Sequence, residues 1–535
     1  MFDVIIKNGQ IYDGTGNPPT QLDIGIEDGK IKQIDKLDEL ESDSVIDAKG
    51  LAVSPGFIDT HTHSDLLCSQ PEVHKIRLQQ GITTELFGQD GISVAPVSEK
   101  TKPLWQAQLK GLDGDIGDWP WESVADYLTY LEKTPIAGNA LYLVPHGGVR
   151  TLAMGFEERI ATKEELEEMT VLVEEGMKQG AVGVSSGLIY PPNVFSNKEE
   201  LIAICEGAAK YDGVFVVHIR NESNKSLEAL DEVVDVARQT GIRLHISHFK
   251  VAGKINRDKF IKFLEKMDMA RKEGIEVTFD QYPYTAGSTL FSSVLPPWMH
   301  SGGSSEMLER LQDESIREKI KKEFKENNNY ENWVYNCGWE NITINTVASE
   351  NNNECEGKNM LDIAKLRNQD PDEAALDLLI EENGAITMTV HWGKEEDLIY
   401  GMKHPLQMVG ADGIFGSKPH PRLYGTFARV LGKYARDEGI FTLSEGVRKM
   451  TGAAAQLLRM KDRGILREGY YADIVVFDPD TIIDNATYDD PLQLPSGILY
   501  VFVNGKLTVR DGDYTGETAG QILRNEDSKY RKVSS

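Results

Sequence analysis

Two histidines in a short motif give the first sign of chemistry in this sequence. His61 and His63 follow the apolar run LAVSPGFID, and side chains two residues apart point to the same face of an extended chain. Both imidazoles could therefore hold one metal ion. An isolated His-x-His pair is a weak signal, but a position directly after a buried strand is where an α/β barrel places its functional groups.

Two further histidines and an aspartate end other apolar runs. His218 closes GVFVVH, and His248 closes RLHISH about thirty residues later, which is the length of one strand-helix-strand unit. Neighbouring parallel strands would bring both to the same rim. Asp412 ends QMVGAD, where it could bind metal, act as a general base or merely cap a helix. Three residues before His248, His245 faces the other way on a strand, so we interpret it as a packing histidine.

These residues need strands to position them, and eight apolar runs of strand length alternate with helix-like stretches. The predicted strands are residues 51–60, 84–88, 139–145, 181–186, 214–219, 243–248, 276–281 and 407–412. Eight such units fit a parallel barrel better than an open sheet, although sequence alone separates the two poorly. In both architectures the chemistry lies at the carboxyl ends of the strands.

The residues between Gly287 and about Gln369 exceed what one strand-helix unit needs. They contain SSEMLERLQDESIREKIKKEFKENNN, which is typical of charged helices. We predict an insertion after the seventh strand that could cover the active site.

Both ends of the chain are typical of short strands with tight turns. Asp28-Gly29 and Asn504-Gly505 suit two-residue hairpin turns. Neither end has enough strands to form a stable sheet alone, so we predict that the two ends join into one sandwich.

The overall composition excludes several classes of protein. The 535 residues carry a net charge of −28, which would repel nucleic acid and acidic membrane surfaces. No window approaches the ~20 apolar residues of a membrane helix, and the N-terminus lacks the pattern of a secretory signal. We therefore expect a cytoplasmic protein of two domains with no nucleic-acid or membrane partner. The four scattered cysteines favour reduced thiols.

Several motifs, taken in order, resemble those of the amidohydrolase superfamily and, within it, the N-acyl-D-amino-acid deacylase (D-aminoacylase) family. They are PGFIDTHTHSD, GITTELFGQDG, VPHGGVR, GVSSGLIYPP, HIRNES, ISHFK, YPYTAGST, GADG, HPRLYGTFARVLG and RGILREGYYADIVVFDP. The resemblance covers nearly the whole chain and implies a (β/α)8 TIM barrel with a small β-sandwich formed by both termini. The implied division is residues 1–55 for the first part of the sandwich, 56–464 for the barrel with the insertion at about 287–369, and 465–535 for the second part and a C-terminal tail.

The resemblance also implies roles for the metal-site residues. His61 and His63 correspond to ligands of one zinc ion, His218 and His248 to ligands of another, and Asp412 to the catalytic aspartate, which also contacts the metal.

One departure from the family pattern concerns the motif after the second strand. The family usually has a metal-binding cysteine after Gly-Asn, whereas this sequence has Gly88-Gln89-Asp90. The Asp90 carboxylate could bridge two ions, but it is harder than sulfur and would shift preference from Zn²⁺ toward Mn²⁺, Co²⁺ or Fe²⁺. The alternative is that Asp90 is only a turn residue and that one ion is bound.

A free amino-acid product carries a carboxylate, so the pocket should offer cationic and hydrogen-bonding groups for it. By resemblance these groups are Lys250, Tyr282, Ser288 and Arg422, of which arginine can meet a carboxylate with two parallel hydrogen bonds. Each also has a structural alternative, such as a salt bridge for Arg422 or core packing for Tyr282. Three further candidates are weaker. His146 is expected to face the pocket, Tyr190 to pack beside the substrate, and His420 to orient the nearby Arg422 loop.

The predicted function is metal-dependent hydrolysis of a linear amide, with N-acyl-D-amino acids as the small-molecule substrates. An alternative is a cyclic-amide hydrolase of the hydantoinase or dihydroorotase type, but these usually carry a carbamylated lysine after strand four, and GVSSGLIY has none. A barrel that has lost catalysis and only binds a partner is a further alternative; unpaired buried imidazoles speak against it. The sequence leaves the oligomeric state open.

Overall fold

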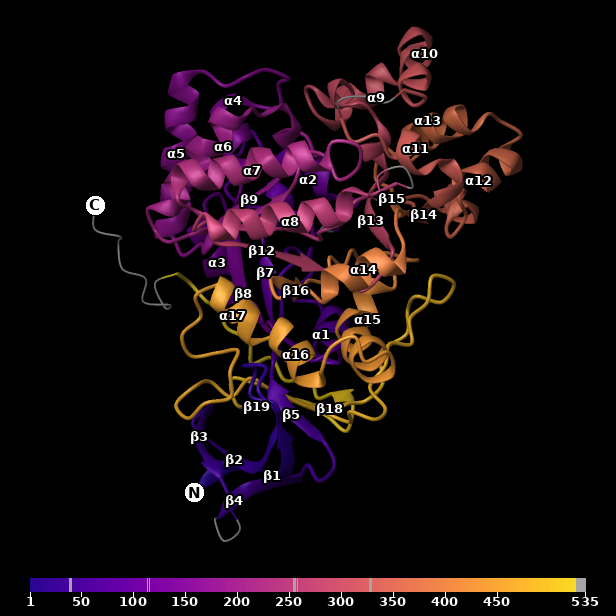
Figure 1. Cartoon of the computed structure of the whole chain (residues 1–535). Coiled ribbons are helices and arrows are strands. Elements are labelled where there is room, and N and C mark those ends of the chain that lie inside the picture. The colour runs from indigo at the N-terminus through magenta and orange to yellow at the C-terminus, as the bar shows by residue number, and fades with distance from the viewer. Residues whose placement is uncertain are drawn as a thin grey trace.

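The computed structural model describes residues 1–37, 41–112, 114, 116–253, 256, 258–326 and 330–525. The expected C-terminal tail at 526–535 and the last part of the expected charged helices, 327–329, lie outside these residues. Figure 1 shows the sheet built from the two termini at one end, the barrel beyond it, and the insertion at the side of the barrel.

Eight parallel strands form the predicted barrel, which is confirmed. Their order is β16-β12-β11-β10-β9-β8-β7-β6, and a parallel bridge between Thr62 and Gly413 brings the two edge strands together. Nearly every residue in these strands is buried, as expected when helices cover a parallel sheet. The strands are β6 (Phe57–Asp59), β7 (Ile82–Phe87), β8 (Asn139–Pro145), β9 (Gly183–Gly187), β10 (Val214–His218), β11 (Arg243–Ile246), β12 (Val277–Gln281) and β16 (Gln407–Val409).

The helices between and after these strands begin and end at recognisable signals. Ser123 and Thr162 each form a capping box with the third residue of the helix that follows, and Gly241 ends another helix in the left-handed conformation. The helices are α1 (Pro71–Leu78), α2 (Lys102–Leu109), α3 (Val124–Glu132), α4 (His146–Met154), α5 (Lys163–Lys178), α6 (Lys198–Ala209), α7 (Ser226–Thr240), α8 (Lys259–Lys272), α14 (Glu395–Met402), α15 (Arg422–Arg429), α16 (Leu443–Lys449) and α17 (Gly452–Leu457).

The first predicted strand, residues 51–60, divides between two sheets. Its first half is β5 (Ala52–Pro55), which pairs with strands from both termini, and its second half is β6 of the barrel. Gly56 lies at the junction, where an added β-carbon would be 2.1 Å from the hydroxyl of Thr83. The absence of a side chain therefore lets the chain pass tightly from one sheet to the other.

The two termini do form one β unit, as predicted. Nine strands share a single hydrogen-bonded sheet, in which β5 joins the N-terminal strands to the C-terminal strand β17. A bridge between Lys30 and Tyr471 bends the sheet back over a core that includes Ile24, Val53 and Phe502. The remaining strands are β1 (Phe2–Ile11), β2 (Thr20–Glu27), β3 (Lys30–Asp35), β4 (Ser42–Asp47), β17 (Ile474–Phe477), β18 (Ile498–Val503), β19 (Lys506–Arg510) and β20 (Asp513–Tyr514).

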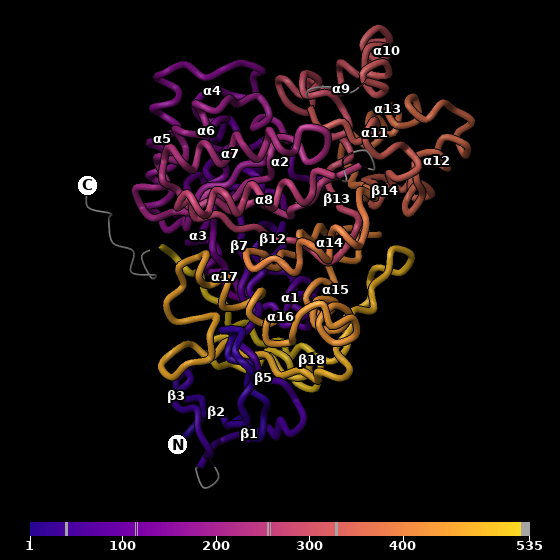
Figure 2. Tube along the Cα trace, viewed as in Figure 1, coloured from indigo at the N-terminus to yellow at the C-terminus, as the bar shows by residue number. Residues whose placement is uncertain are grey.

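The chain between β12 and β16 forms an insertion that lies to one side of the barrel (Figure 2). It has its own small sheet and its own core. The sheet was not anticipated: three antiparallel strands in the order β13-β15-β14 carry the segment to His391, beyond the expected end near Gln369. The core includes Phe291, Trp339 and Met388. The elements are β13 (Ala286–Leu290), α9 (Ser304–Arg310), α10 (Glu314–Glu323), α11 (Trp333–Cys337), β14 (Ile342–Thr346), α12 (Met360–Arg367), α13 (Pro371–Glu381) and β15 (Thr387–His391).

Within the described ranges, no helix combines the length and the apolar character that crossing a membrane requires.

Candidate metal centre

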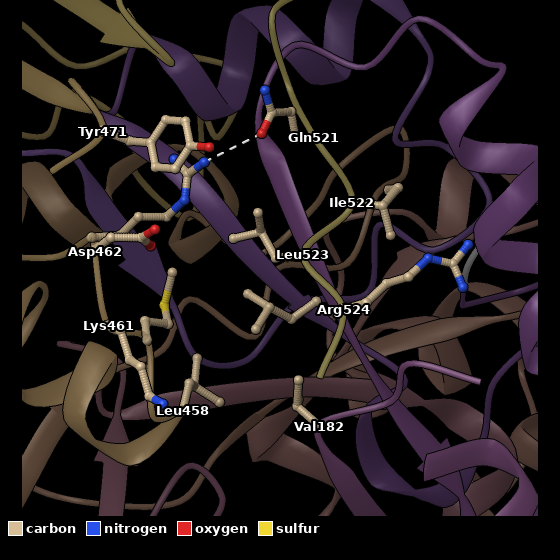
Figure 3. Close-up of a pocket in the computed structure, with 12 residues that line it drawn as sticks. Val182, Leu458, Lys461, Asp462, Tyr471, Gln521, Ile522, Leu523 and Arg524 are labelled. Atoms are coloured by element: carbon tan, nitrogen blue, oxygen red, sulfur yellow. Dashed lines mark hydrogen bonds between the residues drawn. The ribbon is translucent and has the colours of Figure 1, made fainter. Parts of the chain in front are cut away.

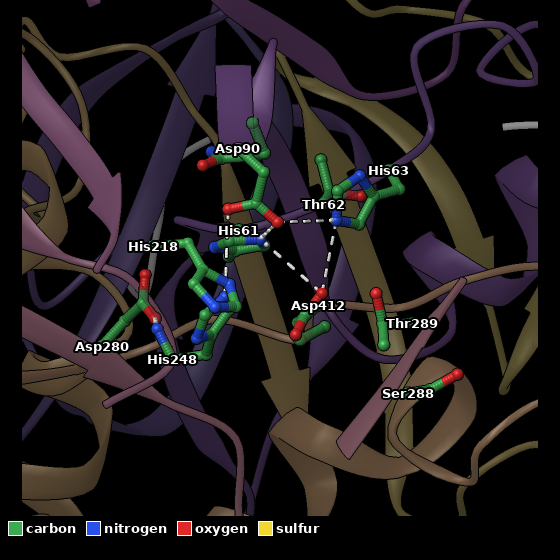
Figure 4. A network of polar contacts seen from close by, with 12 residues as sticks. His61, Thr62, His63, Asp90, His218, His248, Asp280, Ser288, Thr289 and Asp412 are labelled. Atoms are coloured by element: carbon green, nitrogen blue, oxygen red, sulfur yellow. Dashed lines mark hydrogen bonds and ion pairs between the residues drawn. The ribbon is translucent and has the colours of Figure 1, made fainter. Parts of the chain in front are cut away.

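Four histidines and two aspartates meet at the carboxyl end of the barrel (Figure 4). The barrel positions them in a uniform way: each lies at the end of its strand or in the short loop that follows. All six side chains are buried, with residue exposures of 0–5%. The residues are His61 and His63 after β6, Asp90 after β7, His218 at the end of β10, His248 after β11 and Asp412 after β16.

The two aspartates lie between the histidines. The Asp90 carboxylate is 3.7 Å from Nε2 of both His61 and His63 and, through its other oxygen, 3.8 Å from Nε2 of His248. Oδ1 of Asp412 is 3.6 Å from His61 Nε2 and 3.3 Å from His63 Nε2. Asp90 therefore contacts histidines of both expected ligand pairs.

The donor atoms fit a divalent metal. They form three groups in which the possible ligand atoms lie within 4.8 Å of one another: His61 with His63 and Asp90, Asp90 with His218 and His248, and His61 with His248 and Asp412. Both ring nitrogens of His61 and of His218, and Oδ1 of Asp90, are buried without a hydrogen-bond partner in the described part of the chain. Such orphaned groups are costly unless something else binds them, and imidazole with carboxylate is an ordinary ligand set for a divalent ion.

Three of these residues adopt a backbone conformation that side chains rarely take. The φ angles of Asp90, His248 and Asp412 are 56°, 32° and 51°. Non-glycine residues in this region are strained, and such strain gathers at functional sites where the surroundings enforce it. For Asp90 the enforcing contacts come from Ser185, whose hydroxyl accepts from the Gly91 amide at 3.0 Å, and from Asn193, which donates to the Asp90 carbonyl at 3.1 Å.

Burial and neighbouring charges shift the pKa values of the metal-site side chains. Burial raises the pKa of Asp412, but the guanidinium of Arg422, 2.9 Å away, and His61 outweigh it and hold that pKa well below its usual value. Burial lowers the pKa of His218 to about 3, so its ring is neutral at physiological pH. A neutral imidazole and an ionised carboxylate are the forms that bind metal.

Sequence reasoning missed one acidic residue of this site, Glu222. Its side chain is buried and lies 3.3 Å from Nε2 of His218, 3.1 Å from Nδ1 of His248 and 2.7 Å from Nζ of Lys250. Burial raises the pKa of Glu222, but His218 and Lys250 outweigh it and lower that pKa to about 2. Glu222 stands in the motif HIRNES, four residues after His218, but a glutamate in a loop is too common to signal a site. A carboxylate that accepts from the far nitrogen of a metal-binding histidine fixes its tautomer and orientation.

Glu222→Gln is expected to weaken metal binding by roughly 10- to 100-fold, the usual effect of losing such a partner. Competition with a chelator of known affinity measures the change. The substitution also leaves Lys250 without its counter-charge, which destabilises the fold. The double variant Glu222→Gln/Lys250→Met removes both charges and should recover the stability without recovering the affinity. Wild-type metal affinity in both variants would refute the role of Glu222.

Five of the six expected substrate-binding residues lie beside the metal centre, and they differ in the contacts that they make within the protein. Tyr190, Lys250, Tyr282, Ser288 and Arg422 all line one cavity next to His218, His248 and Asp412. The hydroxyl of Ser288 accepts from the side chain of Asn345 at 3.0 Å, and its carbonyl accepts from Arg422 at 2.8 Å. The guanidinium of Arg422 stacks on the ring of Tyr282 with 4.5 Å to the centroid. The hydroxyl of Tyr190 is 2.7 Å from that of Thr289.

Three further histidines that the sequence singled out occupy different places in the fold. His146 does not line this cavity: its ring is fully buried between Ser186 at 2.9 Å and Glu200 at 2.7 Å, both nitrogens being used within the fold. His245 belongs to none of the three donor groups described above and contacts Thr278 and Asp280 at 2.8 and 2.9 Å. His420 accepts from the backbone amide of Arg422 at 3.0 Å, beside the cavity.

A second cavity, of about 290 Å³, lies near the opposite end of the barrel, between β8 and the C-terminal segment (Figure 3). Of the cations that line it, Arg463 pairs with Asp473 and stacks on Tyr471, and Arg524 pairs with Glu132 at 2.9 Å. This cavity therefore presents a satisfied structural network and none of the metal-site groups.

Comparison with known proteins finds relatives that match this chain over nearly its whole length. A family model described as Amidohydrolase family matches residues 44–321 and 402–509. D-aminoacylase of Alcaligenes xylosoxydans xylosoxydans is 34% identical over 525 residues, covering 98% of this chain and 97% of that protein. N-acyl-D-aspartate deacylase of the same organism is 33% identical over 530 residues, covering 98% and 96%.

A solved structure is similar over the same span. It is N-acyl-D-glutamate deacylase from Bordetella bronchiseptica, complexed with zinc and a phosphonate inhibitor that mimics the tetrahedral intermediate of the reaction. The TM-score is 0.83 at 31% identity, and the match covers 98% of this chain and 99% of the other. Between its two matched segments the family model leaves residues 322–401 unmatched, and these fall almost wholly in the insertion.

Proposed function

The chain belongs to the amidohydrolase family, and from this premise we propose that it hydrolyses N-acyl-D-amino acids to a D-amino acid and a carboxylate. The observation that carries the proposal is the buried group of four histidines and two aspartates at the barrel mouth, in which His61, His218 and Asp90 have donor atoms without a hydrogen-bond partner among the described residues. The matched relatives are deacylases of D-amino acids and cover nearly the whole chain.

The residues that would hold one or two divalent ions are His61, His63, Asp90, His218, His248 and Asp412. When bound, such an ion lowers the pKa of water from roughly 15.7 to about 7 and polarises the carbonyl of the amide. The protein's own contribution is to fix the donors in place and to keep them out of bulk water, as their burial indicates.

Asp412 moves the proton. Its Oδ2 is held by Arg422 at 2.9 Å and its Oδ1 faces His61 and His63, so the carboxylate is fixed and ionised. An ionised carboxylate can accept a proton from the attacking water. Asp412 then delivers this proton to the departing nitrogen, because an amine leaves poorly unless it is protonated.

The donor set admits several divalent ions. With Asp90 in place of the usual thiolate, the site consists of imidazole and carboxylate donors and contains no sulfur. Zn²⁺ accepts such ligands, and Mn²⁺, Co²⁺ and Fe²⁺ accept them as well, because harder oxygen donors favour these ions more than thiolate does.

The domain division supports this assignment of roles. We propose that residues 56–464 carry the catalysis, that residues 1–55 and 465–535 form the terminal β unit, and that the insertion lies within the barrel segment. The metal-site residues and the cavity residues all fall in the barrel segment.

Amine release from a panel of N-acetyl-D- and N-acetyl-L-amino acids, combined with metal analysis of the purified protein, tests the proposal. We expect hydrolysis of D substrates, loss of activity on chelation and its return with a divalent ion. A panel of hydantoins and dihydroorotate provides the comparison with cyclic amides, for which β9 offers no lysine. Hydrolysis of L substrates alone, or of cyclic amides alone, would refute the proposal.

A further inference from the structure

A buried glutamate of the insertion holds the loop that follows β10. Glu331 is 4% exposed, and its two carboxylate oxygens accept from the backbone amide of Glu222 and from the hydroxyl of Ser223, each at 2.5 Å. Asn336, in α11 of the same insertion, donates to the Ser223 hydroxyl at 2.8 Å. The segment 219–225, which links β10 to α7, is therefore fastened to the insertion at two consecutive residues.

Glu222 is the residue at which this fastening meets the metal centre. Its carboxylate lies 3.3 Å from Nε2 of His218 and 3.1 Å from Nδ1 of His248. Its backbone is held on both sides, because its amide donates to Glu331 and its carbonyl accepts from the amide of Ala252 at 2.6 Å. A shift of this backbone would move the carboxylate away from the two imidazoles, and such a contact fixes the orientation of a metal-binding histidine.

Holding the loop with an ionisable group costs the fold stability. Burial raises the pKa of Glu331 to about 7, although the hydrogen bonds from Ser223 and from the Glu222 amide lower it. A carboxyl group whose pKa is higher in the fold than in the unfolded chain is less favourable there when it is ionised. Its ionisation therefore lowers the stability of the fold as the pH rises from 4.5, the ordinary value, toward 7. What the carboxylate provides is a pair of acceptors for two donors of one loop.

We propose that Glu331 is a positioning residue of the metal centre: it holds Glu222 in the place from which Glu222 orients two of the metal-binding histidines. The inference rests on the metal centre of the proposed function but on no particular substrate. Glu331 lies in the stretch 322–401 that the family model does not match, whereas Glu222 lies in a matched segment. The insertion thus sets the affinity of a site to which it contributes none of the ligand groups described above.

Glu331→Met removes both acceptors and keeps a side chain of similar length. We expect the dissociation constant for Zn²⁺ to rise about 10-fold, at the low end of the range for losing a partner of a metal-binding histidine, because Glu331 acts through Glu222. Glu331→Gln keeps a carbonyl oxygen that can accept from the Glu222 amide, so its dissociation constant should stay within about threefold of wild type. Competition with a chelator of known affinity measures both values.

The matched control is Glu382→Met, at a second buried glutamate of the insertion. Glu382 is 1% exposed and accepts from the amide of Ser349 at 2.7 Å and from its hydroxyl at 2.5 Å, the same two kinds of hydrogen bond. Burial raises the pKa of Glu382, but the hydrogen bonds from Asn352 and Ser349 outweigh it and lower that pKa, so this carboxylate stabilises the fold. Urea unfolding should therefore show the larger loss of stability in Glu382→Met, whereas Zn²⁺ affinity should fall in Glu331→Met alone.

A double-mutant cycle shows whether Glu331 acts through Glu222. In the background Glu222→Gln/Lys250→Met the orienting carboxylate is already absent, so Glu331→Met should raise the dissociation constant by less than about twofold. Ser223→Ala is a milder variant, because it removes one of the two hydrogen bonds and leaves the Glu222 amide paired with Glu331. It should raise the dissociation constant by about two- to fivefold in the wild-type background.

The outcomes of these binding measurements are distinct from those of the activity assay. Wild-type Zn²⁺ affinity in both Glu331→Met and Ser223→Ala would refute the role of Glu331. An undiminished effect of Glu331→Met in the Glu222→Gln/Lys250→Met background would show that it does not act through Glu222, and would overturn the proposal as well. If wild type binds the ion but hydrolyses no N-acyl amino acid, the proposed substrate fails and the role of Glu331 stands. If wild type binds no divalent ion, the metal centre and this inference fail together.

Discussion

Asp412→Asn is expected to lower kcat by about 10²- to 10⁴-fold, the contribution that a positioned general base makes. The amide of asparagine has the size of the carboxylate but cannot accept and return a proton. Metal content should remain close to wild type, because Asp90 and the four histidines keep their donor atoms. Steady-state kinetics and metal analysis of the same preparation give both quantities.

Asp484→Asn is the matched control for this prediction. Asp484 is a carboxylate paired with Arg429 at 2.9 Å, outside the metal centre, so its replacement tests the cost of losing a partly buried ion pair without touching the proton path. A rate for Asp412→Asn close to wild type would exclude proton transfer by Asp412. A large loss of metal in that variant would show instead that Asp412 acts mainly as a ligand.

Most of the barrel could be predicted from the sequence, because its strands are buried on both faces. A strand such as GVFVV is apolar throughout, so its position is visible without a structure, and the histidine that ends it is placed by the same pattern. The division of residues 51–60 between two sheets was not visible, because both halves are apolar and only the close approach of Thr83 to Gly56 distinguishes them.

The small sheet of the insertion could not be predicted in the same way. Its strands β13 (AGSTL) and β14 (ITINT) are short and rich in small or polar residues, so they lack the apolar run that identifies a strand. His146 was placed at the pocket because it ends a strand, but the rotation of the chain into α4 turns its ring toward Glu200.

Asp90→Asn tests whether Asp90 is a metal ligand or only a turn residue. Asparagine tolerates the left-handed backbone of this position, where φ is 56°, as well as aspartate does. The turn is therefore kept, while the negative charge of the Asp90 carboxylate, which contacts histidines of both ligand pairs, is lost. We expect metal content to fall and activity to drop on the order of 10³-fold, the equivalent of several kcal/mol of charge stabilisation. Dialysis against graded metal concentrations, followed by metal analysis and kinetics, measures both.

Asp90→Cys supplies the opposite test at the same position. A thiolate can take the place of the carboxylate between the ions but is softer, so the variant should retain activity and prefer Zn²⁺ over Mn²⁺ or Co²⁺ more strongly than wild type does. If the cysteine variant binds metal and the asparagine variant does not, the negatively charged ligand atom at position 90 is what binds the metal. The turn cannot explain such a result, because cysteine suits a left-handed backbone less well than asparagine does. If Asp90→Asn instead kept full metal content and turnover, Asp90 would be a turn residue and the histidines with Asp412 would suffice to hold the ion.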